Sequence, residues 1–147
     1  MSRLGETQRA YGQLVKLLDQ EIRRRRGSSK ELERFRETLD LAFYLLGWSQ
    51  FEYLVTREAG EFVKEKAKLR TVERYAWEHL KENFKALKVR RKLDLLFHDD
   101  TEARGKLSKN YELRNEAAHE NKPLPQEARN LSVWLQELEG LIERFSR

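Results

Sequence analysis

The sequence predicts an all-α protein, a bundle of four to five helices joined by short connections. Apolar residues recur at the three- and four-residue spacing of amphipathic helices along nearly the whole chain. Only 7 of the 147 residues are glycine and 2 are proline, fewer than the turns of a β-sandwich or barrel need. Hydrophobic residues make up 39% of the chain and aromatic residues 10%, which is enough for the core of a single domain over residues 1–147.

The helix boundaries follow from the residues that interrupt the apolar stripes. Gly27–Ser29 separates the first two helices, with Ser29 as the N-cap of the second. Pro123 and Pro125 end the fourth. The stretch Leu41–Val55 is apolar on almost every side, so we expect it to be buried, either centrally in the bundle or beneath a partner subunit. The expected helices run from about Glu6 to Arg25, Lys30 to Lys66, Val72 to Phe97, Leu107 to His119 and Gln126 to Phe145, with a loop at His98–Asp100 and Gly105.

Several kinds of functional site are excluded. The chain has no cysteine, which removes disulfides, thiolate zinc sites and cysteine nucleophiles. The histidines, His79, His98 and His119, lack a second His or Cys at ligand spacing, so we expect no metal and no cofactor. His98–Asp100 fits a polar loop that caps helix ends better than a weak cation site. Neither a glycine-rich phosphate loop nor a serine elbow occurs.

The charge leaves the partner open. Lys and Arg number 30 against 25 Asp and Glu, and the net charge of +5 permits a nucleic-acid partner without requiring one. The basic clusters Arg23–Arg26, Lys64–Arg70 and Lys88–Lys92 could each contact RNA phosphates or form a solvated helix face. The N-terminus is polar, and the longest apolar run, Leu41–Trp48, is less than half a membrane span. We therefore expect a cytoplasmic protein that does not enter a membrane.

The segment Tyr111–Glu120 combines side chains suited to phosphate chemistry. Arg114 is followed directly by Asn115, and His119 comes five positions after the arginine. On an α-helix Asn115 and His119 share a face, whereas Arg114 lies about 140° from His119. The arginine and histidine can then converge only if the helix loosens near the prolines or if a second subunit contributes. The two small alanines before His119 would let a substrate strand or a partner helix approach closely.

This segment resembles the signature of the HEPN superfamily, in which an arginine and a polar residue are followed by three variable residues and a histidine. Trp48–Leu54 resembles the long helix of that family, which carries an acidic residue among apolar ones, here Glu52. Arg74 and His79 have the same separation, but Tyr75 takes the place of the amide there.

The resemblance implies a HEPN-like bundle and a metal-independent endoribonuclease that acts as a homodimer with a composite active site. His119 would act as general acid or base, and Arg114 would stabilise charge on the phosphoryl oxygens. Asn115 would orient His119 or the scissile phosphate, and Glu52 would hold Arg114. A carboxylate on a solvated helix edge is the other interpretation of Glu52. Attack of a ribose 2′-hydroxyl on the adjacent phosphorus would leave a 2′,3′-cyclic phosphate.

The biological setting implied by the resemblance is a prokaryotic toxin or phage-defence effector with an antitoxin or defence-system partner. Two other hypotheses stay open. One is a non-catalytic HEPN-like module that binds RNA, a nucleotide or a protein partner. The other is a helical scaffold in which Arg114 and His119 are structural.

Overall fold

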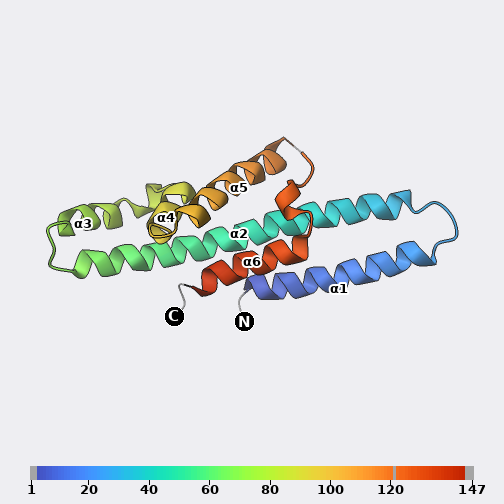
Figure 1. Cartoon of the computed structure of the whole chain (residues 1–147), viewed down its shortest axis with the longest axis horizontal. Coiled ribbons are helices and arrows are strands. Elements are labelled where there is room, and N and C mark those ends of the chain that lie inside the picture. Colours follow the sequence, from blue (N-terminus) through green and yellow to red (C-terminus); the bar gives the residue numbers. More distant parts are fainter. Residues whose placement is uncertain (1–2, 121, 145–147) are drawn as a thin grey trace. The chain divides into compact units, whose positions relative to one another are not determined.

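The protein is an all-α helical bundle, as predicted. The computed structural model describes residues 3–120 and 122–144, and no strand occurs among them. The chain forms two compact units: Met1–Phe51 with Leu113–Arg147 make unit 1, and Glu52–Glu112 make unit 2. The helices α2 and α5 contribute residues to both. In chain order the elements are α1 (Arg3–Arg24), α2 (Lys30–Lys68), α3 (Arg74–Glu82), the 3-10 helix η1 (Phe84–Ala86), α4 (Val89–Leu96), α5 (Thr101–His119), the 3-10 helix η2 (Gln126–Ala128) and α6 (Leu131–Glu143) (Figure 1).

In unit 1, α1 and the first half of α2 lie side by side as an antiparallel hairpin (Figure 1). Near the start of α1 the Thr7 hydroxyl donates to Gln50 Oε1 at 2.7 Å. One turn further on, the Tyr11 ring packs 5.5 Å from the Phe43 ring and its hydroxyl donates to Asp40 Oδ1 at 2.6 Å. Burial of Tyr11, together with this hydrogen bond to a carboxylate, raises its pKa above the ordinary value.

Helix α6 packs against this hairpin through aromatic rings and a notch at a glycine. The Trp134 ring centroid lies 4.8 Å from that of Tyr44 and 5.6 Å from that of Trp48. Gly47 and Leu135 are both buried, and a Cβ atom at position 47 would collide with the Leu135 side chain. The absence of a side chain at Gly47 is therefore what lets α6 approach α2 this closely.

We expect Gly47→Ala to destabilise the protein by about 1–2 kcal/mol, because overpacking against buried Leu135 exceeds the gain of about 1 kcal/mol in helix propensity. Gly12→Ala and Gly105→Ala are matched controls, since each position is exposed within a helix and a Cβ there meets nothing within 4 Å. Each control should stabilise by about 0.5–1 kcal/mol. Urea denaturation measures the free energy of unfolding of all three variants. A Gly47→Ala variant more stable than wild type would show that close packing of α6 on α2 does not require glycine at this position.

Leu41–Val55 is not buried on almost every side by the bundle of one chain, so the first of the two predicted alternatives, central burial, is wrong. Leu46 is 42% exposed and Tyr53 is 68% exposed. Neighbouring helices pack against one stripe of α2 with three- and four-residue spacing and leave other positions to solvent. Cover by a partner subunit stays a prediction. The buried stripe of this stretch consists of Tyr44, Trp48, Phe51 and Val55.

Unit 2 has its own core, in which α2 meets α3, α4 and the first part of α5. The Phe62 ring contacts the Trp77 ring edge-on at 5.6 Å and lies 5.9 Å from the His98 ring. Lys92 is buried, and its ammonium donates to Thr56 Oγ1 at 3.1 Å. The fully or largely buried apolar residues are Val55, Ala59, Val63, Ala67, Leu93, Leu96, Phe97 and Leu107.

The third predicted helix is divided. The stretch expected as one helix from Val72 to Phe97 forms α3, η1 and α4. Asn83 follows the end of α3, where its side-chain amide donates to the His79 carbonyl at 2.9 Å. A side chain that bonds the backbone in this way competes with continuation of the helix.

The fourth and fifth predicted helices begin elsewhere. α5 begins at Thr101 rather than Leu107, because Asp100 Oδ1 accepts from the Ala103 backbone N–H at 3.0 Å and caps the helix. Gly105 is thus inside a helix and not in a loop. The last helix begins at Leu131, where Asn130 Oδ1 accepts from Val133 N–H at 3.3 Å, and Gln126–Ala128 is η2 instead. Its predicted end at Phe145 lies outside the described residues.

Candidate active site

Arg114, Asn115 and His119 all lie in the last turns of α5, within unit 1. The helix stays α-helical through His119, and the Glu120 backbone N–H still donates to the Glu116 carbonyl at 2.8 Å. The helix therefore does not loosen before His119. This excludes the first of the two ways in which an arginine and a histidine of this motif could converge, and leaves the contribution of a second subunit. Arg114 is about 140° around the helix from His119, so one chain presents the two side chains in different directions.

Arg114 is held by its neighbour in the sequence. Its Nη1 donates to Asn115 Oδ1 at 2.8 Å, and its Nε is shielded from solvent. Both residues are half-buried. A guanidinium fixed at one end in this way loses less rotational freedom when its other N–H groups bind an anion. In this structure Asn115 thus accepts a hydrogen bond from Arg114. Adjacency in the sequence permits this contact but does not predict it.

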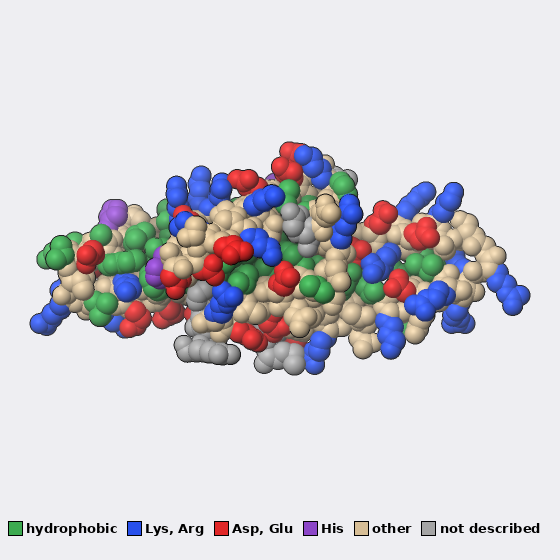
Figure 2. All heavy atoms as spheres, viewed as in Figure 1, with side chains coloured by type: hydrophobic (Ala, Val, Ile, Leu, Met, Phe, Trp, Pro, Cys, Tyr) green, Lys and Arg blue, Asp and Glu red, His purple; other side chains and the backbone are tan. Residues whose placement is uncertain are grey.

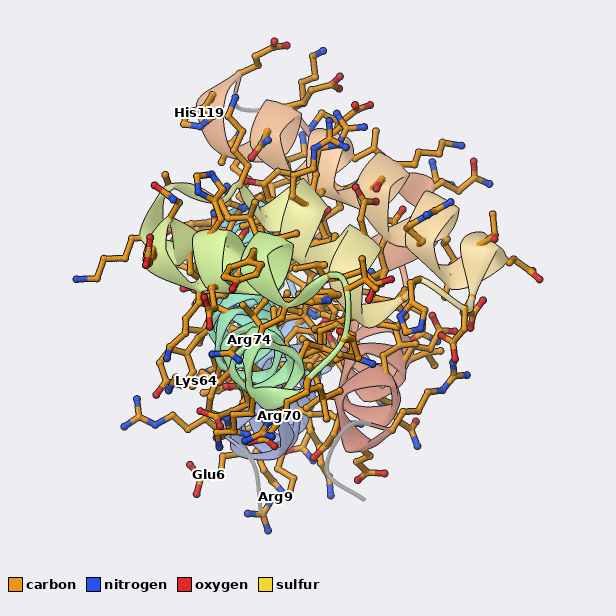
Figure 3. All side chains as sticks on the ribbon, turned by 90° about the vertical axis from the view of Figure 1, so that its left-hand side faces the viewer. Glu6, Arg9, Lys64, Arg70, Arg74 and His119 are labelled. Carbon is orange, nitrogen blue, oxygen red and sulfur yellow. The ribbon has the colours of Figure 1, made fainter. Side chains whose placement is uncertain are left out.

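His119 is the last residue of α5 and is exposed, and its side chain projects from the end of the helix (Figure 3). Within the described part of the chain it makes no hydrogen bond or ion pair. Of the two small residues before it, Ala117 is buried and Ala118 is exposed. Ala118 and His119 are thus both open to solvent at the end of α5.

Glu52 lies on α2 and belongs to unit 2, whereas Arg114 belongs to unit 1. Glu52 is half-buried, and its Oε1 is shielded from solvent. A carboxylate oxygen removed from water needs compensating polar groups, which is the condition that motivated the prediction of an arginine partner. The contact between Glu52 and Arg114 itself stays a prediction.

Other features of the described residues offer no competing chemistry. They contain no group of three or more His, Asp or Glu side chains that could hold a metal ion. No helix in the part of the chain that the structure describes is long and apolar enough to cross a membrane. An open apolar groove of about 380 Å³ lies in unit 1 between α1 and α2, and none of the four predicted site residues lines it. The groove is lined by Leu14, Leu17, Leu18, Glu21, Phe35 and Leu39.

The basic cluster Lys88–Lys92 is not wholly on the surface: Lys88, Arg90 and Arg91 are exposed, but Lys92 is not. Lys92 is buried beside Leu93 and Leu96, and its ammonium lies 5.2 Å from the centre of the Phe84 ring. From the sequence we expected Lys92 on the surface with the other cations of this cluster, and its burial was not predicted. The signal was available, because Lys92 is four residues before Leu96 and therefore on the apolar side of α4.

No protein-family model matches the chain, and no curated protein or solved structure was found to match it. The structure therefore defines the class as an all-α helical bundle that carries an Arg–Asn pair and an exposed His at the end of one helix.

Proposed function

We propose that the protein is a metal-independent endoribonuclease of the HEPN type. The observation that carries the proposal is the arrangement at the end of α5, where Arg114 is bonded to Asn115 and His119 is exposed one helical turn further on. A positioned cation and accessible imidazoles are the kinds of group that phosphodiester transfer uses when no metal takes part.

In this reaction the ribose 2′-oxygen attacks the adjacent phosphorus and the bond from phosphorus to the 5′-oxygen breaks. An imidazole accepts the proton of the 2′-hydroxyl, and a second, protonated imidazole gives a proton to the departing 5′-oxygen. The products are a 2′,3′-cyclic phosphate and a 5′-hydroxyl. Arg114 would donate two N–H groups to the non-bridging oxygens, where negative charge builds.

Two features of the motif support a homodimer. Each motif holds one imidazole, whereas the reaction uses an acid and a base. The helix is also regular through His119, so Arg114 and His119 of one chain lie on different sides of α5. Two motifs that face one cleft would supply both imidazoles and an arginine aimed at the phosphate. Glu52 would hold Arg114 in that arrangement.

The family resemblance supports a role as a toxin or phage-defence effector in a prokaryotic cytoplasm, controlled by an antitoxin or another defence component. This setting belongs to the proposal and depends on the activity.

The test is incubation of the wild-type protein with single-stranded RNA in excess EDTA. We expect cleavage that EDTA does not reduce, with products that carry a 2′,3′-cyclic phosphate and a 5′-hydroxyl. Because the site is composite, activity per molecule should fall when the protein is diluted below the dimer dissociation constant. Dependence on Mg²⁺, or products with a 5′-phosphate, would contradict the mechanism. RNA binding without cleavage would favour the non-catalytic module.

A further inference from the structure

A run of cations connects α3 to α4 in unit 2. Residues 81–92 contain six Lys and Arg residues and one acidic residue, Glu82. Lys81 on α3, Lys85 on η1 and Lys88 at the start of α4 are all exposed, and we call these three residues the lysine strip. Figure 2 shows Lys and Arg side chains gathered along the upper edge of unit 2, over α4.

The lysine strip is not neutralised by neighbouring acids. The two arginines beside it are paired: Arg90 with Glu112 at 3.0 Å and Arg91 with Asp94 at 3.1 Å. By contrast, none of the three strip ammonium groups makes a hydrogen bond or ion pair with the described residues. The strip therefore leaves three ammonium groups in solvent with their full hydrogen-bonding capacity.

The placement of these cations opposes the stability of α4. Lys88 is the N-cap residue, and Arg90 and Arg91 lie in the first turn, where the helix dipole makes a cation unfavourable. The first turn contains no acidic residue, and the cap makes no side-chain hydrogen bond. Arg23 and Arg24, by contrast, are in the last turn of α1, where the same dipole favours them. Lys81 is likewise in the last turn of α3, where the dipole favours it. Helix stability therefore accounts for the basic end of α1 and for Lys81, but not for Lys88.

The chemistry of the surface indicates the class of partner. Phe84 is half-buried, and the Lys92 ammonium occupies one face of its ring. Residues 81–92 expose no large hydrophobic side chain that would enter a lipid surface. In unit 2 such side chains occur elsewhere, at Tyr53, Leu69, Val72 and Tyr75. Lysines without a large exposed hydrophobic side chain beside them suit phosphate groups on a backbone, which they contact irrespective of base sequence.

We propose that the lysine strip binds the phosphate backbone of single-stranded RNA. The proposal rests on the proposed action on RNA and extends it, because it assigns substrate binding to a second surface, made by unit 2, that reads charge and not sequence. The strip would hold up to three phosphates, one for each lysine.

The test is the salt dependence of RNA binding by the full chain, with Lys81→Gln, Lys85→Gln and Lys88→Gln combined. All proteins carry His119→Ala so that the RNA stays intact, and anisotropy of a labelled uridine oligonucleotide gives the affinity. Each lost phosphate contact removes about 0.7 from the slope of log affinity against log salt. We therefore expect the slope to fall by about 2, and affinity at about 0.1 M salt to fall by about 100-fold.

The matched control combines Arg9→Gln, Lys16→Gln and Lys30→Gln in unit 1. These residues are also exposed, and both triple variants lower the formal net charge from +5 to +2. Arg9 is shown in Figure 3. The control should keep most of the slope and the affinity, because it changes the total charge and leaves the strip intact.

Three results would overturn the proposal: no RNA binding by the parent, an unchanged slope in the strip variant, or an equal loss in the control. An unchanged RNA slope with loss of binding to anionic vesicles would identify a membrane partner instead. The two proposals can fail separately. A wild-type protein that binds RNA through the strip and does not cleave it contradicts the nuclease and keeps the strip. RNA cleavage by a protein whose RNA binding does not depend on the strip contradicts the strip and keeps the nuclease.

Discussion

Replacement of His119 by alanine is expected to lower RNA cleavage by a factor of about 10²–10⁴, the usual contribution of a positioned general acid or base. The side chain is exposed at the end of α5, so its loss removes no buried contact and the variant should fold. In a composite site the substitution removes the imidazole from both subunits at once, which takes away the acid and the base together. Initial rates on a labelled RNA in EDTA measure the effect, and circular dichroism checks the fold.

The chain supplies a matched control for this variant. His79 is also exposed and also follows an arginine, Arg74, by five positions, but Tyr75 stands where the motif has Asn115. His79→Ala should therefore leave cleavage unchanged. Equal activity of the His119 variant and wild type would refute the assignment, and so would an equal loss in both histidine variants.

Trp48→Ala is expected to have the largest effect on stability, a loss of about 3–5 kcal/mol in the free energy of unfolding. Trp48 is fully buried, and its ring centroid lies 5.6 Å from those of Phe51 and Trp134. Removal of the indole leaves a cavity between α2 and α6, and it also removes the aromatic contacts that join the two helices in unit 1.

Thermal unfolding should show this loss as a fall in Tm of about 10 °C for a chain of this size. Tyr53→Ala is the control, because that aromatic residue is on the same helix and is 68% exposed. Its effect should stay within about 0.5 kcal/mol. A Trp48→Ala variant that unfolds at the temperature of the Tyr53→Ala variant would show that the indole is not part of a packed core.

The helices were predictable where apolar periodicity and strong interruptions agree. The break at Gly27–Ser29 and the start of α2 at Lys30 follow from the glycine and the interrupted apolar stripe. The Ser29 hydroxyl donates to the Glu33 carboxylate at 3.2 Å, so its role as N-cap stays a prediction. The break at Asn83 was missed because neither Gly nor Pro is present there, and the helix stops through a side-chain bond to the His79 carbonyl. The predicted polar loop at His98–Asp100 that caps a helix end is confirmed at Asp100, but Gly105 was given too much weight as a helix breaker.

The candidate site was predictable to the extent that it lies on one helix. Helical periodicity alone places Asn115 and His119 on one face, and the regular end of α5 preserves that relation. The hydrogen bond from Arg114 to Asn115 depends on rotamers, which a spacing rule does not specify. The burial of Leu41–Val55 was overestimated for a related reason, because composition gives the apolar content of a helix but not how many neighbours cover it.

The notch at Gly47 also determines the register of α6. Leu135 occupies the space that a side chain at this position would fill, so sliding α6 by one turn would push Leu135 against a residue that has a side chain. Gly5 on α1 lies against the carboxylate end of Glu139 on α6, a side chain that can move aside, so the stop on α6 is the one at Gly47. Residues 120–130 are all that join His119 to the start of α6. Gly47, a residue far from the motif, thus limits where α5 can end within unit 1 and therefore where the proposed catalytic imidazole can be.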